Sequence, residues 1–454
     1  MYNKADKEMQ MEKIFEAVES YKDLILEAER YIWAHPETGY REANTSAYMA
    51  EKFRALGYDN LVMAGNIPGF YTVVDTGREG PEVLILAEMD SLICPNHKEC
   101  DPKTGYVHAC GHHAQCAAML GIAGALRDES VLSMLSGRVR LCVVPAEELI
   151  EIEYRTELKK QGVIKHFGGK SEFLYRGYFD GVDIAFMVHT AGGFVVEKGS
   201  IGCIAKKIKY KGVSAHAGGS PHLGVNALYA ATQGLSAANA LRETFQESDF
   251  IRFHPIITHG GEAVNAIPET VTVESFVRGA TFEAILRENK KINRALCGAA
   301  VSMGANVEIE DYPGYAPLHN DAGMIELSRE AFKLAAPDKE YHVTDSVSRG
   351  STDMGELCGL MPVIHPYIGG ASGKGHGDDY VISNPYDACV VSAKWQMAML
   401  ALLLENGGER ARKIMADFTP KFASKEEYFE FIEQLNSKGE KIAYNEDGSV
   451  TVKP

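Results

Sequence analysis

Short apolar runs that alternate with helical segments constrain the fold of this chain more than any other feature. The runs have the length of buried strands, and they lie at 83–88, 139–144, 182–188 and 361–368. An amphipathic segment at 8–34 and a segment of small residues at 114–128 have helical character. Strands and helices in alternation predict an α/β fold, with a mostly parallel sheet and helices on both faces.

Residues 198–309 have a different pattern, which we interpret as an inserted small α+β domain. Stretches that alternate between polar and apolar residues follow one another with helical stretches between them, at 205–212, 226–243, 270–279, 283–304 and 306–312. The resulting β-α-β-α-β order predicts that the larger α/β domain is discontinuous and consists of 1–197 and 310–454.

Length, charge and cysteine content narrow the class of protein. A chain of 454 residues exceeds a single hydrophobic core. Its formal net charge of −16 disfavours nucleic acid or an anionic membrane as a partner, although it allows a small anionic substrate. Nine scattered cysteines do not form a disulfide framework, and the charged N-terminal segment has no apolar core typical of a secretory signal. We therefore expect a cytoplasmic protein.

Polar residues follow the buried strands at the points where the strands end. Asp90 comes after the run at 83–88, Glu147 and Glu148 come after 139–144, and His189 directly follows 182–188. The carboxyl ends of strands in open α/β sheets are where ligands bind. The sequence therefore predicts a site at this edge of the sheet.

Two further segments carry side chains that bind metals. Cys110 and His112 stand two residues apart where a small-residue helix begins, and His376 lies in a glycine-rich loop at 369–380. Sulfur and imidazole ligands combined with carboxylates suit zinc, and also manganese, cobalt or nickel. Each piece also has a purely structural interpretation, such as a core histidine or a solvated glutamate pair. Their common position at the ends of predicted strands favours a metal site.

Several motifs occur in a characteristic order along nearly the whole chain. They are HPETGYRE (35–42), EMDSL (88–92), HACGH (108–112), PAEE (145–148), GVSAHAGGSPHLGVNAL (212–228), GGEAVNAIPETVTVESFVRG (260–279) and GSTDMGE (350–356). The ordered set resembles the clan MH metallopeptidase-like amidohydrolases of the aminoacylase, hippurate-hydrolase and indole-acetyl-amino-acid hydrolase type. Within them it is most similar to the branch that contains p-aminobenzoyl-glutamate hydrolase. This resemblance implies a zinc-peptidase-like catalytic domain and a ferredoxin-like lid and dimerisation domain.

The resemblance also implies a role for individual residues. Cys110 would bridge two divalent metal ions, and the other ligands would be His112, Glu148, His189 and His376. Glu147 would be the general base, and Asp90 would be a carboxylate that contacts the metal ligands without binding the metals itself. His216 would reach across a homodimer to polarise the scissile carbonyl group. The substrate, with its free carboxylate, would be bound by Asn265, Arg278 and, as a weaker candidate, Arg349.

The implied reaction is hydrolysis of the amide bond of small N-acyl amino acids or dipeptide-like molecules by a hydroxide generated at the metals. Two alternatives stay open: a non-catalytic metal-binding or scaffold relative, and a peptidase for longer peptides. His113 and Gln115 depart from the usual residues after the HACGH motif, and the segment from Glu148 to His189 is longer than usual and includes a basic stretch. We expect these departures near the entrance, where they would affect the choice of substrate.

Cys94, His97 and Cys100 suggest another metal site, which would need a fourth ligand from elsewhere.

Overall fold

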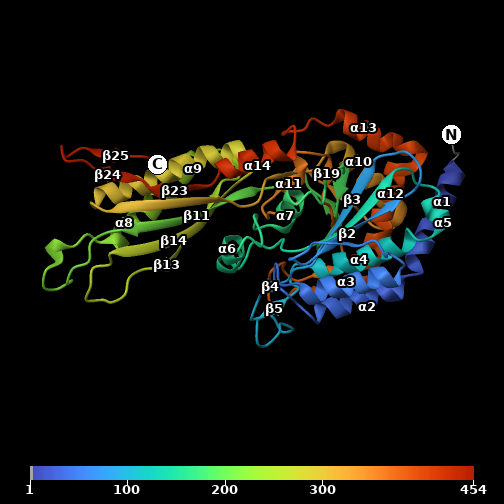
Figure 1. Ribbon diagram of the computed structural model, residues 1–454, viewed down its shortest axis with the longest axis horizontal. Coiled ribbons are helices and arrows are strands. Elements are labelled where there is room, and N and C mark those ends of the chain that lie inside the picture. Colours follow the sequence, from blue (N-terminus) through green and yellow to red (C-terminus); the bar gives the residue numbers. More distant parts are fainter. Residues whose placement is uncertain (1–3) are drawn as a thin grey trace. The chain divides into compact units, whose positions relative to one another are not determined.

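A computed structural model describes residues 4–454, which divide into two compact units (Figure 1). The large unit contains the residues up to Gly199 together with His319–Ser346 and Asp353–Lys425. The small unit contains Ser200–Leu318, Val347–Thr352 and Glu426–Pro454. The sequence predicted a small domain at 198–309 and assigned the two later segments of the small unit to the larger domain.

The large unit is built on a six-stranded sheet with the order β1-β2-β6-β3-β7-β19. These strands are β1 (Val62–Met63), β2 (Phe70–Asp75), β6 (Arg138–Val144), β3 (Glu82–Glu88), β7 (Ile184–Phe186) and β19 (Val363–Ile364). Strands β6, β3, β7 and β19 are parallel, whereas β2 runs antiparallel to β6 and β1 runs antiparallel to β2. The predicted mostly parallel sheet is confirmed.

The run predicted as one strand at 361–368 forms two strands in different sheets. β19 joins the main sheet, while β20 (Tyr367–Ile368) pairs in parallel with β8 (His189–Thr190). Pro366 lies between β19 and β20 and has no N–H group for a sheet ladder, which explains the break. The change of sheet places His189 beside the end of this segment.

Helices cover the main sheet, and α4 (His112–Ala125) lies at the centre with every residue buried. It contacts α1 (Lys4–Glu19), α2 (Lys22–Trp33), α3 (Ala43–Ala55) and α12 (Ser392–Leu404). Figure 1 shows α2 and α3 beside it. The stretch Tyr386–Asp417, which includes α12, is long and apolar enough to cross a membrane, but 94% of its most apolar window is buried inside the structure, as in a core helix.

The prediction of a single helix at 8–34 is wrong, because α1 ends at Glu19 and α2 begins at Lys22. The Ser20 hydroxyl donates to the Ala17 carbonyl at 2.7 Å and so competes with helical hydrogen bonding. The Tyr21 ring packs so closely on Gly124 of α4 that a Cβ atom there would lie 2.6 Å from it. Packing against α4 therefore coincides with the break.

The interface between α2 and α4 contains a buried pair of ionisable groups. The Oε1 atom of Glu29 lies 3.3 Å from Nε2 of His113, and both side chains are fully buried. Burial raises the pKa of Glu29 to about 7 and lowers the pKa of His113 to about 3. Gln115 is also buried and donates to Glu88 at 2.8 Å. The interpretation of His113 and Gln115 as entrance residues is therefore wrong, since α4 is enclosed on all sides.

We expect Glu29→Gln to change how the free energy of unfolding depends on pH. A carboxyl group with a raised pKa in the folded state contributes stability below its unfolded pKa of 4.5, and this contribution is lost as the pH rises towards 7. The variant should gain about 1–3 kcal/mol relative to the wild type between pH 5 and pH 8, measured by urea unfolding. Glu27→Gln, at an exposed position of the same helix, is the control. An equal difference between variant and wild type at both pH values would contradict the prediction.

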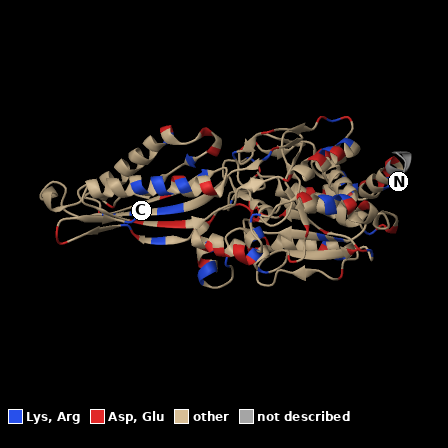
Figure 2. Ribbon diagram, turned by 90° about the horizontal axis from the view of Figure 1, so that it is seen from above, with Lys and Arg blue, Asp and Glu red and all other residues tan. Residues whose placement is uncertain are grey.

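The small unit is an antiparallel sheet with the order β12-β14-β11-β15-β23, covered by α8 (Ala227–Ala240) and α9 (Phe282–Ser302). The strands are β12 (Arg252–Phe253), β14 (Thr270–Gly279), β11 (Gly202–Lys211), β15 (Asn306–Pro313) and β23 (Ser437–Glu440), and β13 (Ile256–His259) also pairs with β14. Charged residues of both signs lie on its strands and helices (Figure 2). β23 lies in the C-terminal tail of the chain, and its sequence SKGE has no apolar alternation that would predict a strand.

Candidate metal centre

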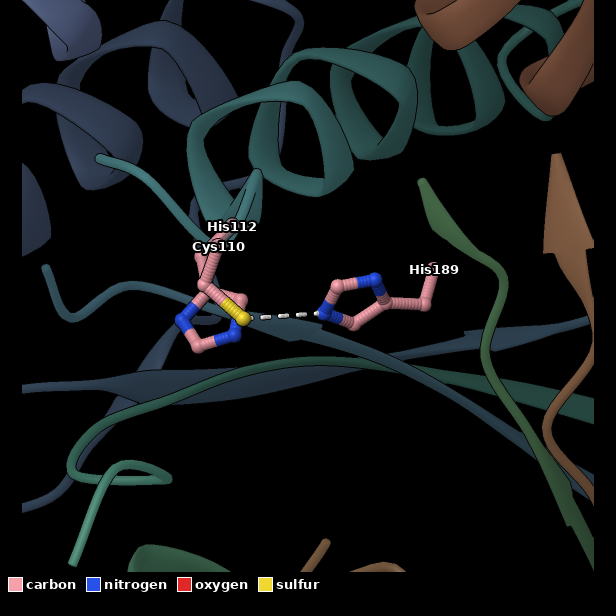
Figure 3. Close-up of side chains that lie close together, drawn as sticks. All are labelled: Cys110, His112 and His189. Atoms are coloured by element: carbon pink, nitrogen blue, oxygen red, sulfur yellow. Dashed lines mark hydrogen bonds between the residues drawn. The ribbon is translucent and has the colours of Figure 1, made fainter. Parts of the chain in front are cut away.

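Cys110, His112 and His189 converge at the carboxyl ends of the strands (Figure 3). The Sγ atom of Cys110 lies 3.4 Å from Nε2 of His189, and one ligand atom from each of the three residues lies within 4.8 Å of the others. Gly111 precedes α4 with a φ angle of 94°. A Cβ atom at this position would lie 2.0 Å from the Thr190 hydroxyl oxygen, so only glycine fits the turn that presents Cys110 and His112 together.

Cys110 also belongs to a second group, with Glu148 and His376, whose ligand atoms again lie within 4.8 Å of one another. The Nε2 atom of His376 lies 3.2 Å from Oε1 of Glu148. His376 has a φ angle of 63°, and its N–H donates to the Ala109 carbonyl at 2.8 Å. This bond attaches the glycine-rich loop to the cysteine loop, and the two groups share a single sulfur atom.

Asp90 connects ligands from two different strand ends. One carboxylate oxygen lies 3.1 Å from Nδ1 of His112, and the other accepts the Glu148 N–H at 2.8 Å. The main-chain oxygen of Asp90 also lies 2.8 Å from Nδ1 of His112. Because these contacts occupy Nδ1, Nε2 of His112 points towards Cys110 and the glutamates. Metal-binding histidines commonly have this arrangement, in which a carboxylate contacts the ring nitrogen that does not bind the metal.

The donor atoms fit a pair of divalent cations. Nε2 of His112 and Oε1 of Glu148 are buried, and within residues 4–454 neither makes a hydrogen bond of good geometry, although Glu88 and His376 lie 3.2 Å from them. Burial raises the pKa of the Cys110 thiol well above its usual value. Burial alone would lower the pKa of His112, but the charges of Cys110 and Glu88 raise it well above its usual value. His112 and Glu148 are buried, Cys110 and His189 are partly buried, and His376 is exposed. A set of sulfur, nitrogen and oxygen donors that must lose protons to bind is typical of a transition-metal site.

Glu147 lies beside this donor set and is 6% exposed. Its carboxylate, His112 and Glu148 together offer ligand atoms within 4.8 Å of one another. Burial, reinforced by the charges of Glu88 and Glu148, raises the pKa of Glu147 well above its usual value. A carboxyl group in this environment holds a proton more readily than one in water.

A buried charge network that sequence reasoning missed lies next to Glu147. The ammonium group of Lys170 contacts the carboxylates of Glu88 and Asp353, and all three side chains are fully buried. Oxygens of Glu88, Asp353 and Glu147 lie within 4.8 Å of one another. Burial raises the pKa of Asp353 to about 6, although Lys170 opposes the shift. Glu88 and Asp353 lie in the EMDSL and GSTDMGE motifs, whereas Lys170 ends the basic stretch that we expected near the entrance. Its full burial makes that expectation wrong for Lys170.

The other predicted site residues belong to the small unit. Nδ1 of His216 accepts the Gly219 N–H at 2.9 Å, and the adjacent Ala217 N–H donates to the Asn265 carbonyl at 3.0 Å. Arg278 donates to the Ser351 hydroxyl at 3.0 Å, and the guanidinium group of Arg349 lies 5.2 Å from the Phe250 ring centroid. His216 and Asn265 are thus neighbours within this unit.

The alternative metal site at Cys94, His97 and Cys100 is not supported. Nε2 of His97 contacts the Tyr380 carbonyl at 2.8 Å, and the Cys100 thiol donates to the Pro95 carbonyl. In the part of the chain that the structure describes, none of the clusters of metal-binding side chains includes these residues. The histidine attaches this loop to the glycine-rich segment.

Comparison with known proteins places the chain in a family. The profile of peptidase family M20/M25/M40 matches residues 84–400. The Xaa-Arg dipeptidase of Mus musculus is 27% identical over 81% of this chain and 81% of its own. A p-aminobenzoyl-glutamate hydrolase chain from Escherichia coli is 27% identical over 65% of this chain and 59% of its own.

Among solved structures, a dinuclear metal-binding M20 peptidase from Bacillus subtilis superposes with a TM-score of 0.65 at 20% identity. The match covers 85% of this chain and 99% of that protein, so both units share its fold. The profile match includes all five clustered ligands and Glu147. The chain therefore belongs to peptidase family M20/M25/M40 and is a metal-dependent amidohydrolase or peptidase.

Proposed function

We propose that this protein hydrolyses the amide bond of small N-acyl amino acids or dipeptide-like molecules, with p-aminobenzoyl-glutamate as a representative substrate. The observation that carries the proposal is the Cys110 sulfur shared between two groups of ligands, with Glu147 beside them. The names of the mammalian dipeptidase and the bacterial p-aminobenzoyl-glutamate hydrolase support this class of substrate.

Two sets of side chains would hold the metals, with Cys110 common to both. His112 and His189 complete one set, and Glu148 and His376 complete the other. When bound, two divalent ions polarise an amide carbonyl group and lower the pKa of a water molecule. The mixed sulfur, nitrogen and oxygen donors favour zinc or manganese, with cobalt or nickel as alternatives.

Glu147 is the group that moves the proton. Its carboxylate takes a proton from the attacking water and delivers it to the nitrogen of the departing amine. Burial and the neighbouring carboxylates raise its pKa, which stabilises the protonated form between these two steps. Glu148 cannot do this work because its oxygens are metal ligands. The two adjacent glutamates thus have different tasks.

The small unit would supply groups for substrate binding and for dimerisation. Asn265, Arg278 and Arg349 would bind the free carboxylate of the substrate, and His216 of a second subunit would polarise the scissile carbonyl group. Exposed apolar side chains in this unit support a homodimer: Leu223, Tyr229, Ile256 and Val264. We also propose a cytoplasmic location, where a reducing environment suits nine cysteines scattered along the chain.

We expect Glu147→Ala to retain its metal and to lose turnover by about 10²–10⁴-fold, because it lacks the proton carrier. The measurement is hydrolysis of p-aminobenzoyl-glutamate, hippurate, N-acetyl amino acids, dipeptides and pentapeptides after reloading with zinc or manganese. Glu157→Ala, at an exposed position, is the control. Undiminished turnover would remove Glu147 from the mechanism, and preferred cleavage of pentapeptides would favour the peptidase alternative. Bound metal without turnover of any substrate would favour the scaffold alternative.

We expect Cys110→Ser to bind at most about half of the wild-type metal, because both ligand groups lose their common sulfur. Elemental analysis of dialysed protein measures the metal content. Cys358→Ser, which changes a half-buried thiol outside these groups, should leave it unchanged. Equal metal content in Cys110→Ser and the wild type would exclude the shared-ligand role.

We expect His216→Ala to keep its metal and to lose turnover by about 10²–10³-fold, because the developing oxyanion loses a donor. Mixing subunits of His216→Ala with subunits of Glu147→Ala tests the role across a dimer. Heterodimers then contain one complete site, so roughly a quarter of the wild-type turnover should return after random exchange. A mixture as inactive as its components would show that His216 does not act across a dimer.

A further inference from the structure

The stretch from Glu148 to His189, which the sequence marks as longer than usual, contains a fully buried arginine at position 155. We propose that Arg155 is a positioning residue that fixes the backbone on both sides of Glu147 and thereby aims the general base. This inference rests on the proposed function, because it assigns Arg155 a task in that reaction. The hydrogen bonds of Arg155 go to main-chain carbonyl groups and not to the metal-binding side chains.

The guanidinium group of Arg155 contacts carbonyl groups of the catalytic loop. Nη2 donates to the carbonyl of Glu148, and Nη1 lies 3.5 Å from the carbonyl of Ala146. Nη1 also donates to the Phe167 carbonyl at 2.6 Å, twelve residues further along the chain. The planar guanidinium group therefore contacts the residues before and after Glu147 and joins them to Phe167.

The loop needs this support because its backbone is strained. Ala146 has a φ angle of 58°, a left-handed conformation that residues with a side chain rarely adopt. Such a conformation persists only where surrounding contacts impose it. The Ala146 N–H donates to Glu42 at 2.7 Å, and its carbonyl accepts the Gly169 N–H at 3.1 Å. Arg155 adds the contact that extends over Glu147 to Glu148.

The segment 151–166 contacts the loop at 35–42. The hydroxyl of Thr38 donates to Glu151, and the guanidinium group of Arg41 lies 3.6 Å from the Tyr154 ring centroid. The Tyr40 hydroxyl donates to the His166 carbonyl at 2.9 Å. The segment 151–166, which includes helix α6 (Ile152–Lys160) and Arg155, is therefore held at both of its ends. Because the backbone around Arg155 is held in place, the position of its guanidinium group is also restrained.

Gly39 provides the space for this guanidinium group. A Cβ atom on Gly39 would lie 2.3 Å from Nη2 of Arg155 and 2.9 Å from Cα of Ala146. Its φ angle lies outside the left-handed range that favours glycine, so the requirement for glycine here is one of space. The loop at 35–42, Arg155 and the strained Ala146 thus pack as one assembly.

Arg155→Met tests the proposal, because methionine fills the space without donating to the carbonyls. A displacement of about 1 Å in a catalytic group can cost about 10²-fold in rate. We expect kcat to fall by about 100-fold, KM to change by less than about threefold, and the metal content to stay at the wild-type value. Hydrogen exchange of the peptide that spans 144–150 should become at least about tenfold faster, whether or not substrate is present.

Arg176→Met is the matched control. Arg176 donates to the Val163 carbonyl of the same segment at 2.7 Å and to the Ala64 carbonyl at 2.9 Å, but not to the catalytic loop. It should lower stability while leaving kcat and hydrogen exchange at 144–150 unchanged. An equal loss of kcat in both variants would reduce Arg155 to a structural role and overturn the proposal. Loss of metal in Arg155→Met would also overturn it, because the effect would then act through Glu148.

Gly39→Ala provides a second test that keeps the charge, and it decides the matter if Arg155→Met does not fold. The added methyl group should displace the guanidinium group and reproduce the fall in kcat. In the double variant the two losses should not add, because both act through the same loop.

Wild-type kcat and unchanged exchange in Gly39→Ala and Arg155→Met would overturn the proposal while leaving the proposed function intact. An inactive wild type would instead refute the proposed function, and hydrogen exchange alone would then decide whether Arg155 holds the loop.

Discussion

The carboxylate of Asp90 is the interaction on which the candidate site depends. It lies at the end of β3 and contacts His112 at the start of α4 and Glu148 after β6. Because β3 and β6 are adjacent parallel strands, their carboxyl ends open at the same edge, and one side chain can join both. A buried carboxylate bound on both sides keeps the ligands oriented before any metal arrives.

Charge compensation is the second constraint. Glu88, Glu147 and Asp353 bring oxygens close together in a buried region, and such a concentration of negative charge is unfavourable unless cations lie nearby. Lys170 supplies one cation within the protein, and divalent ions at Cys110 would supply more. The same region thus combines a permanent positive charge with a set of donors that requires metal.

Buried polar contacts also determine the shape of the loop that carries Glu147. Its neighbour Ala146 has a conformation that an isolated peptide would leave, and contacts from Glu42, Gly169 and Arg155 oppose that relaxation. These contacts come from segments far apart in the chain. The position of Glu147 is therefore a property of the packed unit rather than of the PAEE motif.

The sequence by itself determined the α/β class, the ligand types and their places at strand ends, because strand and helix periodicities and the motif around Cys110 are local features. It also placed most of β3, β6, α4, β11 and β14 correctly, since their apolar patterns are strong. It did not reveal the break between α1 and α2, the burial of His113, or the pairing of β23 with β15. Nor did it reveal the burial of Lys170 and Arg155. Only the tertiary structure decided these points, because burial and charge pairing depend on contacts between residues that are distant in sequence.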